Sequence, residues 1–572
     1  MIELTLESGF FMRAVLLASS FLCAALVTLA PFSTPAFAAQ AQGSETAESG
    51  NDSVASPMPG AEPQAPGAVT VPAITAPDGA ATPAISIDEA QRRQALQKLI
   101  SERVARLTDR KDEQTAVDAF YKERDFQPLW IADGAPTAQA QAAIDHLKYV
   151  AREGLDPADY PRPELPPFLN PEDAAAAELK LTLSLLTYAR HASSGRVSYT
   201  RVSAAILYPP GTIGPAQVLS QLAASKDVTA TLDGFEPPQP GYKALKAQLA
   251  KAMTTPGAPK RGAKMSNADL IVANMERWRW LPRDLGASYV MVNIPQYALQ
   301  LMDRGKPLWA TKIVVGKPGD MATPLLSETM KYLTVNPTWN VPPSIIRNEY
   351  LPALERDSGA LERIGLKVGR NHDGSVRVYQ PPGPKNALGR IRFNFPNPFL
   401  VYQHDTPNKN LFAQDKRALS HGCMRVQNPD KYAEALLSVS QPKEGMTAAR
   451  IRDLYGDAER TINLHRPIPV HITYQTASVD EAGNLVTRDD IYGLDAAIIK
   501  LMHGRERAVA DKAIPRKYES SSKPVMARLP RSFAEGNNEP RRSRSFGEEE
   551  PHQRTFAQPY PAAFFDRAMW AW

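Results

Sequence analysis

One short segment of the chain has the residue types of a nucleophilic site. Residues 418–426 read ALSHGCMRV, and a second histidine, His404, stands upstream in the run VYQHDTP. A thiol attacks as its thiolate, so Cys423 would need a base that takes its proton and surroundings that favour negative charge. The segment predicts one of three roles for Cys423: a nucleophile, a metal ligand or a buried thiol without chemistry.

His404 is the better candidate for that base, because its ring comes from a separate part of the chain. Either the backbone or the side chain of Asp405 can orient the ring. A strand that ends at His404, a loop and a second strand over residues 420–426 would place the imidazole beside Cys423 if the strands pair. We therefore expect a thiol and an imidazole on neighbouring strands.

The residues around Cys423 suggest how an intermediate could be held. On a regular strand, His421 and Cys423 would share a face because they are two positions apart. Gly422 between them lets a substrate backbone approach closely. Main-chain N–H groups from Gly422 to Met424 could then hold an oxyanion.

Two other roles for the thiol stay open. A zinc site could use His404, His421 and Cys423, but no fourth ligand and no close C-x-x-C or H-x-x-x-H pair is evident. A structural thiol is the second alternative, although the polar neighbours Ser420 and Arg425 make an apolar burial site less favourable. The residues favour a nucleophile and predict no metal.

The amino-terminal segment predicts export. From Met12 the chain has one basic residue, an apolar run and then the A-x-A pattern at residues 36–38. We interpret residues 1–38 as a signal peptide, with an uncleaved membrane anchor as the alternative. Of the two cysteines, Cys23 lies in this segment, so cleavage would leave Cys423 as the single thiol.

Both ends of the remaining chain predict disorder. Residues 39–87 are rich in Ala, Pro, Gly and Ser and cannot bury enough apolar surface to offset chain entropy. Residues 504–572 are polar and of mixed charge before an aromatic terminus. The formal net charge of +5 is small for 572 residues and argues against a dedicated nucleic-acid binder.

The part between these ends divides into two domains of different periodicity. Residues 88–253 predict a helical domain; Asn170 and Pro171, for example, supply a cap and a first helical position. Residues 268–503 predict a mostly β domain, interrupted by a helical, charged insert at about 344–378. The expected strands are 289–294, 309–315, 331–335, 399–402 and 469–473. The fold class is therefore α+β.

The run HDTPNKNLFAQDKRALSHGCMRV resembles the signature of L,D-transpeptidases of the YkuD type. The likeness to the large, multidomain branch of that family extends over MERWRWLP, VVGKPGDMATP, VNPTWNVPPSI, PGPKNALGRIRFNFPN and DDIYGLD. In the helical half, FYKERDFQPLW, AREGLDPADY and SSGRVSY resemble its scaffold domain. The peptidoglycan-binding module that such proteins commonly insert between the two domains is missing from this sequence.

The resemblance implies a role for each residue of the motif. Cys423 would be the nucleophile and His404 the base, with a capping subdomain over the site at about 344–378. The residues implied to hold the oxyanion or the substrate are His421, Gly422, Ser420, Met424, Arg425, Tyr402, Trp339 and Asp405. No metal or organic cofactor is implied.

The implied reaction is 3→3 cross-linking of peptidoglycan stem peptides through a cysteine thioester. A tetrapeptide stem would be the donor and the diaminopimelate amine of another stem the acceptor, and carbapenems would be inhibitors. The implied location is the periplasm of a Gram-negative-type cell, where other wall-synthesis proteins could be partners. Hydrolysis by an L,D-carboxypeptidase and attachment of proteins to the wall are alternatives at the same site. A non-catalytic wall scaffold is the alternative from another class.

Overall fold

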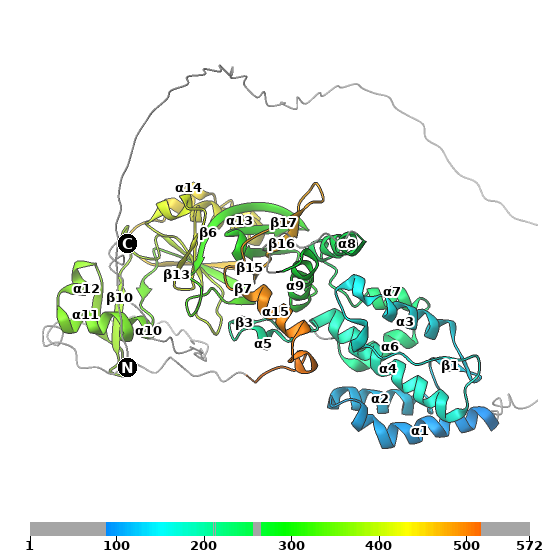
Figure 1. The fold of residues 1–572 in the computed structure, drawn as a ribbon. Helices are drawn as coiled ribbons and strands as arrows, with labels where there is room; N and C mark the ends of the chain where they lie inside the picture. Colours follow the sequence, from blue (N-terminus) through cyan, green and yellow to red (C-terminus); the bar gives the residue numbers. More distant parts are fainter. Residues whose placement is uncertain (1–86, 210, 212, 255–264, 516–572) are drawn as a thin grey trace, which may run out of the picture. The chain divides into compact units, whose positions relative to one another are not determined.

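The computed structural model describes residues 87–209, 211, 213–254 and 265–515. The predicted signal peptide at 1–38, residues 39–86 of the predicted linker and residues 516–572 of the predicted tail lie outside this part. Within it, helices and strands are both abundant, as the α+β expectation required (Figure 1). No helix of the described ranges is long and apolar enough to cross a membrane.

The amino-terminal half of the described chain is helical, as expected. Its helices are α1 (Ile87–Leu107), α2 (Lys111–Glu123), α3 (Ala138–Lys148), α4 (Pro171–Ser194), α5 (Tyr199–Val202), α6 (Pro215–Ala223), α7 (Val228–Asp233) and α8 (Pro240–Thr254). Short 3-10 turns lie at η1 (Val150–Glu153) and η2 (Pro157–Asp159), and short strands at β1 (Ile131–Ala132), β2 (Ala135–Pro136) and β3 (Ile206–Leu207).

The central helix α4 begins and ends where its sequence predicts. The side chain of Asn170 accepts a hydrogen bond from the N–H of Asp173, and Pro171 occupies the first turn. Gly195 ends the helix with φ +98°, a conformation that favours glycine. Leu179 and Leu185 are fully buried in the core of this domain. Caps and apolar spacing were therefore sufficient to locate the helix.

The carboxyl-terminal half of the described chain is built on one large sheet. Its strands are β4 (Ser288–Asn293), β5 (Ala298–Asp303), β6 (Lys306–Gly316), β7 (Leu325–Val335), β11 (Ile391–Asn394), β12 (Gln403–His404), β13 (Ala418–Ser420), β14 (Met424–Val426) and β15 (Arg460–Thr473). They follow the order β11-β12-β14-β6-β5-β4-β15-β7-β3, with β13 beside β6, and β11 also pairs with β7. That last pairing closes the sheet on itself around an apolar core (Figure 1).

Helices and short elements complete this half. They are α9 (Asn267–Trp280), α13 (Pro429–Ser440), α14 (Ala448–Arg452), α15 (Leu494–His503), β16 (Ala477–Val479), β17 (Leu485–Thr487), η3 (Ile294–Gln296), η5 (Lys409–Ala413), η6 (Pro442–Glu444) and η7 (Arg507–Val509). The residues around η7 differ from expectation. The predicted disordered tail began at residue 504, yet residues 504–515 are described and Ala510 is fully buried.

One expected strand is wrong. Residues 399–402 lie outside any strand: a turn ends at Phe399, residues 400–402 are irregular, and the strand β12 begins at Gln403. The cause is Asn397, whose side-chain amide donates to the carbonyl of Val401 at 2.7 Å, while Leu400 takes a positive φ of +55°. A local side-chain bond to the backbone competes with the strand that the β-branched and aromatic residues predict.

The insert forms a small unit with its own core. It contains β8 (Trp339–Asn340), α10 (Pro343–Ile345), a π-helical turn η4 (Ile346–Tyr350), α11 (Leu351–Arg356), α12 (Ala360–Arg363), β9 (Lys367–Arg370) and β10 (Val376–Gln380). The strands make a separate sheet in the order β8-β10-β9. The apolar core of this unit is Val341, Ile346, Leu354, Leu361, Leu366, Val376 and Val378. We call residues 339–380 the cap.

Candidate active site

Cys423 lies in a sharp bend between two strands. The sequence predicted one regular strand over residues 420–426, but residues 421–423 are bends and Gly422 has φ +115°. The strand rule for side-chain faces therefore does not apply to His421 and Cys423. Ser420 closes the bend, because its hydroxyl donates to the Cys423 carbonyl at 2.6 Å and accepts from the Gly422 N–H at 3.2 Å.

Further hydrogen bonds hold the bend in place, from residues that the sequence did not indicate as part of the site. The Thr323 hydroxyl donates to the Gly422 carbonyl at 2.8 Å and accepts from the Gly316 N–H at 2.8 Å. The Tyr492 hydroxyl donates to the Gly316 carbonyl at 2.7 Å. A Cβ atom at Gly316 would lie 1.9 Å from the Met321 carbonyl oxygen, so this position requires glycine.

The two predicted strands do pair, in parallel. Gln403 of β12 is aligned with Met424 of β14, and His404 with Arg425. The Met424 N–H donates to the Tyr402 carbonyl at 3.0 Å, which places Tyr402 next to Cys423. Residues two apart on a strand share a face, so Tyr402 and His404 point to the same side of the sheet. The structure thus brings the thiol strand and the histidine strand together.

The sulfur of half-buried Cys423 is hydrogen-bonded by Tyr402. Burial raises the pKa of the thiol to about 11, although hydrogen bonds from the backbone N–H and the phenol of Tyr402 act to lower it. The Trp339 side chain in turn hydrogen-bonds the Tyr402 phenol. At neutral pH the resting sulfur is therefore a protonated thiol in a site that already holds donors for a thiolate.

His404 is a buried, neutral imidazole. Its Nδ1 lies 2.5 Å from the carbonyl oxygen of Asp405, so Nδ1 donates. Burial, followed by the charges of Arg425 and Arg392, lowers the pKa of His404 to about 3. Hydrogen bonds to the carbonyls of Asp405 and Leu388 act to raise that pKa. The Tyr402 ring meets the His404 ring edge-on at 5.7 Å between centroids. The resting pair is neutral thiol and neutral imidazole, not an ion pair.

Asp405 orients His404 through its backbone and not through its side chain. Its carboxylate accepts from the N–H groups of Arg390 at 2.8 Å and Thr406 at 2.6 Å, and it pairs with the Lys409 ammonium. A Cβ atom at Gly389 would lie 2.4 Å from this side chain. Of the two routes that the sequence left open, the structure shows the main-chain one.

Arg392 is the main site residue that sequence reasoning missed. It lies on β11 directly opposite His404 of β12, and its guanidinium carbon lies 5.5 Å from the centroid of the Tyr402 ring. Its positive charge lowers the pKa of the Cys423 thiol and of His404. A charged residue between the apolar residues Ile391 and Phe393 of this strand was the available signal.

The cap meets the site at His421 and Trp339. His421 Nε2 lies 3.9 Å from Glu349 Oε1 of the cap, and burial lowers the pKa of His421, followed by the charges of Lys317 and Arg425. Trp339 belongs to the cap sheet and also reaches Tyr402. The insert therefore contacts His421 within the bend and, through Trp339, the Tyr402 phenol that hydrogen-bonds the Cys423 sulfur.

Only part of the predicted oxyanion site is available. The Gly422 N–H donates to Ser420 and the Met424 N–H donates to Tyr402. Among the described residues, the N–H of Cys423 is the one of these three groups without an acceptor. The Tyr402 phenol, on the same side of the sulfur, is the second donor that the arrangement offers.

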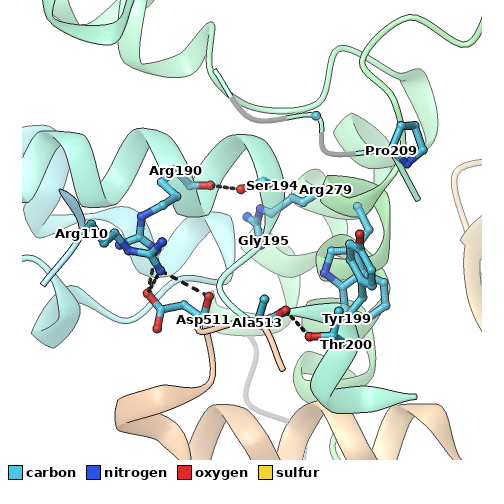
Figure 2. A pocket seen from close by; sticks show the side chains of 13 residues that line it. Arg110, Arg190, Ser194, Gly195, Tyr199, Thr200, Pro209, Arg279, Asp511 and Ala513 are labelled. Atoms are coloured by element: carbon cyan, nitrogen blue, oxygen red, sulfur yellow. Dashed lines mark hydrogen bonds and ion pairs between the residues drawn. The ribbon is translucent and has the colours of Figure 1, made fainter. Parts of the chain in front are cut away.

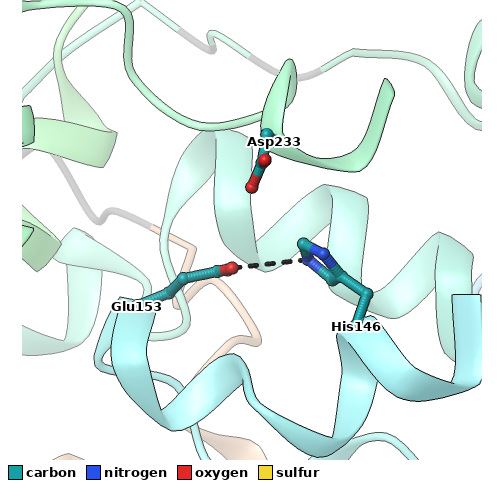
Figure 3. A group of neighbouring side chains, drawn as sticks. All are labelled: His146, Glu153 and Asp233. Carbon is teal, nitrogen blue, oxygen red and sulfur yellow. Dashed lines mark ion pairs between the residues drawn. The ribbon is translucent and has the colours of Figure 1, made fainter. Parts of the chain in front are cut away.

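A second group of ligand-type side chains lies in the helical domain (Figure 3). His146 Nε2 is 3.3 Å from Glu153 Oε1, and Asp233 lies close enough for the three to surround a metal ion. However, the Lys246 ammonium lies 3.7 Å from Glu153 and 3.8 Å from Asp233. That ammonium already supplies the positive charge, so we interpret the group as an ion-pair cluster that joins α3, α7 and α8.

A further pocket lies at the carboxyl end of α4 (Figure 2). Its cations are Arg110 and Arg190, and the Asp511 carboxylate fills the space between them at 3.0 Å and 2.7 Å. Burial acts to raise the pKa of that carboxyl, but the interaction with His191 and the charges of Arg190 and Arg110 hold it well below its usual range. This pocket anchors the segment that follows α15 onto the helical domain.

Comparisons with known proteins agree with this geometry. Residues 287–451 match the model of the YkuD family, described as an L,D-transpeptidase catalytic domain, and residues 115–249 match a Scaffold domain. A putative L,D-transpeptidase of Haemophilus influenzae is 31% identical over 245 residues, which are 40% of this chain and 48% of that protein. The chain thus spans about half the length of the curated relative it matches.

Solved structures of L,D-transpeptidases are also similar in part. The Mycobacterium smegmatis enzyme is 15% identical, with 33% of this chain and 58% of that chain covered and a TM-score of 0.17. The Enterococcus faecium catalytic domain is 16% identical, with 32% and 95% covered and a TM-score of 0.15. The TM-scores are too low to assign a fold, so the assignment of the two regions depends on the family models. Residues 115–249 are thus similar to a Scaffold domain, and residues 287–451 to the catalytic domain of the YkuD family of L,D-transpeptidases.

Proposed function

We propose that the protein forms 3→3 cross-links between peptidoglycan stems through a thioester on Cys423. One observation supports this proposal: the Cys423 sulfur receives hydrogen bonds from Tyr402, the residue directly before the His404 strand, and that strand pairs with the strand that follows Cys423. A structural thiol has no need of two donors that favour its anionic form. The exported location, the periplasm, is part of the same proposal.

The first half-reaction is proton-coupled attack by the thiol. Because the pKa of Cys423 is about 11 and that of His404 about 3, few thiolates exist before substrate arrives. As Sγ bonds to the carbonyl carbon of the third stem residue, its proton moves to His404. The Cys423 N–H and the Tyr402 phenol stabilise the oxyanion. The carbon–nitrogen bond then breaks, and the terminal D-alanine leaves with the proton from His404.

The second half-reaction releases the enzyme. The diaminopimelate amine of another stem gives a proton to His404 and attacks the thioester, the carbon–sulfur bond breaks, and the sulfur regains a proton. The thioester must survive water until the amine arrives, and the cap at Trp339 and Glu349 is placed to exclude solvent. Attack by water would instead give L,D-carboxypeptidase activity, and attack by a protein lysine would anchor that protein.

The same thiol is proposed to react with carbapenems. Two of the similar solved structures are described as an imipenem complex of LdtMt1 and a faropenem-derived adduct of L,D-transpeptidase 3 from Mycobacterium tuberculosis. Attack by Sγ on a β-lactam carbonyl would open the ring and leave an acyl-enzyme. This reaction supplies a readout of thiol reactivity that needs no acceptor.

The test is replacement of Cys423. We expect Cys423→Ala to abolish both dimer formation from tetrapeptide stems and the mass increase with imipenem, with an unchanged melting temperature. Mass spectrometry of the dimer would identify the 3→3 bond. Normal turnover by the variant would refute the thioester. A folded wild-type protein that neither turns over stems nor forms an adduct would favour the non-catalytic scaffold.

A further inference from the structure

The half-buried Arg392 differs in its contacts from the buried arginines Arg277 and Arg279. Its Nε atom is buried without an acceptor, and among the described residues the side chain forms no hydrogen bond and no ion pair. The Nε atoms of Arg277 and Arg279 also lack acceptors, but their other nitrogens bind Asp495 and Glu276. Donors that lose water without gaining an acceptor are costly. Arg392 is therefore prepared for a ligand.

The nearest carboxylates are committed elsewhere. Asp405, the residue after His404, is paired with Lys409 and two backbone N–H groups. Glu349 lies beside His421 on the cap side. No acidic side chain of the described ranges neutralises Arg392, which leaves a positive charge over the Tyr402 ring and next to the reacting sulfur.

We propose that Arg392 binds the terminal carboxylate of the donor stem, on the residue that leaves. This inference rests on the proposed function. In a tetrapeptide donor, one residue separates the attacked carbonyl from that carboxylate, a distance of at most about 3.5 Å. The planar guanidinium binds carboxylates through two parallel hydrogen bonds. The Tyr402 phenol contacts the sulfur, and the Arg392 guanidinium lies over the Tyr402 ring. The attacked carbonyl would therefore lie beside the phenol while the terminal carboxylate meets Arg392.

Carboxylate binding would also activate the base. The charge of Arg392 disfavours protonation of His404, which lies opposite it in the sheet. A carboxylate on Arg392 reduces that repulsion at the moment when His404 must accept the thiol proton. Donors with a free carboxyl group at the leaving residue should therefore gain in kcat as well as in KM.

The experiment measures release of the leaving residue from three donors. They are the tetrapeptide with a free terminal carboxyl, its terminal amide, and the tetrapeptide with the side-chain carboxyl of the third residue amidated. We expect wild-type protein to prefer the free acid over the terminal amide by about 10- to 100-fold in kcat/KM, the range for a hydrogen bond to a charged group. The third donor should react like the first.

Three variants test whether the preference for the free acid comes from the charge of Arg392, from its guanidinium geometry or from neither. Arg392→Gln should reduce the preference to below about 3-fold, with the loss concentrated on the free acid, and Arg392→Lys should retain part of it because charge remains without the fork. Arg390→Gln is the matched control: Arg390 is two positions away and donates to the Gly456 carbonyl at 3.2 Å. It should behave as wild type. Melting curves check folding, and Arg392→Lys serves if Arg392→Gln is unstable.

Two results would overturn the inference. One is an unchanged preference in both Arg392 variants. The other is a penalty on the third donor that disappears in Arg392→Gln, which would assign Arg392 to the side-chain carboxylate. A wild-type protein that turns over none of the donors would instead refute the proposed function, and the inference with it.

Discussion

Two buried polar regions of this molecule are built on opposite principles. On α9, between the helical domain and the sheet, Glu276 pairs with Arg279 and Arg277 with Asp495, and all four side chains are nearly or fully buried. At Cys423, two arginines face a neutral thiol, a phenol and a neutral imidazole. The first region pairs each cation with an acid, whereas Arg392 of the second region forms no ion pair with any described residue.

The difference separates a structural role from a chemical one. In the α9 region most of the other polar atoms also have partners, apart from the Nε atoms of Arg277 and Arg279. Glu276 accepts from the Val197 N–H at 2.5 Å, and Arg279 donates to the Glu153 carbonyl at 2.5 Å and to the Tyr242 hydroxyl at 2.8 Å. Such a network holds segments in one arrangement. The charge of Arg392 near Cys423 would instead favour the negative charge that appears only during the proposed reaction.

The largest effect is expected from removal of a balanced cation. Arg279→Met leaves Glu276 buried and unpaired, which should lower the free energy of unfolding by ~3–5 kcal/mol. Urea denaturation measures it, and Arg304→Met, at a side chain that is 89% exposed, is the control with little effect. If Arg279→Met were as stable as the control, the α9 network would not have the role that we assign to it.

The thiol itself should be slow to react at neutral pH. The raised pKa of about 11 means that thiolate increases with pH up to that value, so iodoacetamide labelling of Cys423 at pH 7 should be about 100-fold slower than that of a thiol with a pKa of 9. Labelling rates on the Cys423 peptide, followed by mass spectrometry, test this. Arg392→Gln should shift the curve to still higher pH. A plateau at pH 7 would contradict a resting thiol.

Loss of one donor to the sulfur should affect catalysis without affecting stability. Tyr402→Phe removes the phenol hydrogen bond to Cys423, and we expect kcat/KM to fall roughly 10- to 50-fold, as for hydrogen bonds to charged groups. Tyr332→Phe on β7 is a control at a tyrosine remote from the sulfur. Equal activity of the two variants would remove Tyr402 from the mechanism.

The smallest effect is expected at Asp511. Asp511→Asn weakens the pairing with Arg110 and Arg190. We expect the substitution to cost ~1 kcal/mol of stability, because these side chains are partly exposed. It should leave kcat unchanged. Thermal unfolding and steady-state kinetics measure the two quantities. A lower kcat at full stability would show that this pocket contributes to the reaction.

Local signals predicted much of this arrangement. The cap and first turn of α4 at Asn170 and Pro171, and the pairing of the strands that carry His404 and Cys423, are found as expected. Both depend on neighbours in sequence or on a single strand pair. The likeness to a known family added the order of the domains and the position of the cap.

Features that depend on several distant segments were not accessible in this way. Thr323, Gly316 and Tyr492 meet under the Gly422 bend only after the sheet has closed. Arg392 is a site residue because β11 is aligned with β12 in one particular register. The neutral state of thiol and imidazole follows from burial, which the motif does not reveal.

Trp339 connects the cap to the chemistry through one side chain. Its strand pairs with β10 of the cap, and its side chain hydrogen-bonds the phenol that contacts the sulfur. A movement of the cap would then displace the Tyr402 phenol, which hydrogen-bonds the Cys423 sulfur. If Cys423 acts as we propose, the emission of this indole would report, in real time, a displacement of the cap from the reacting sulfur.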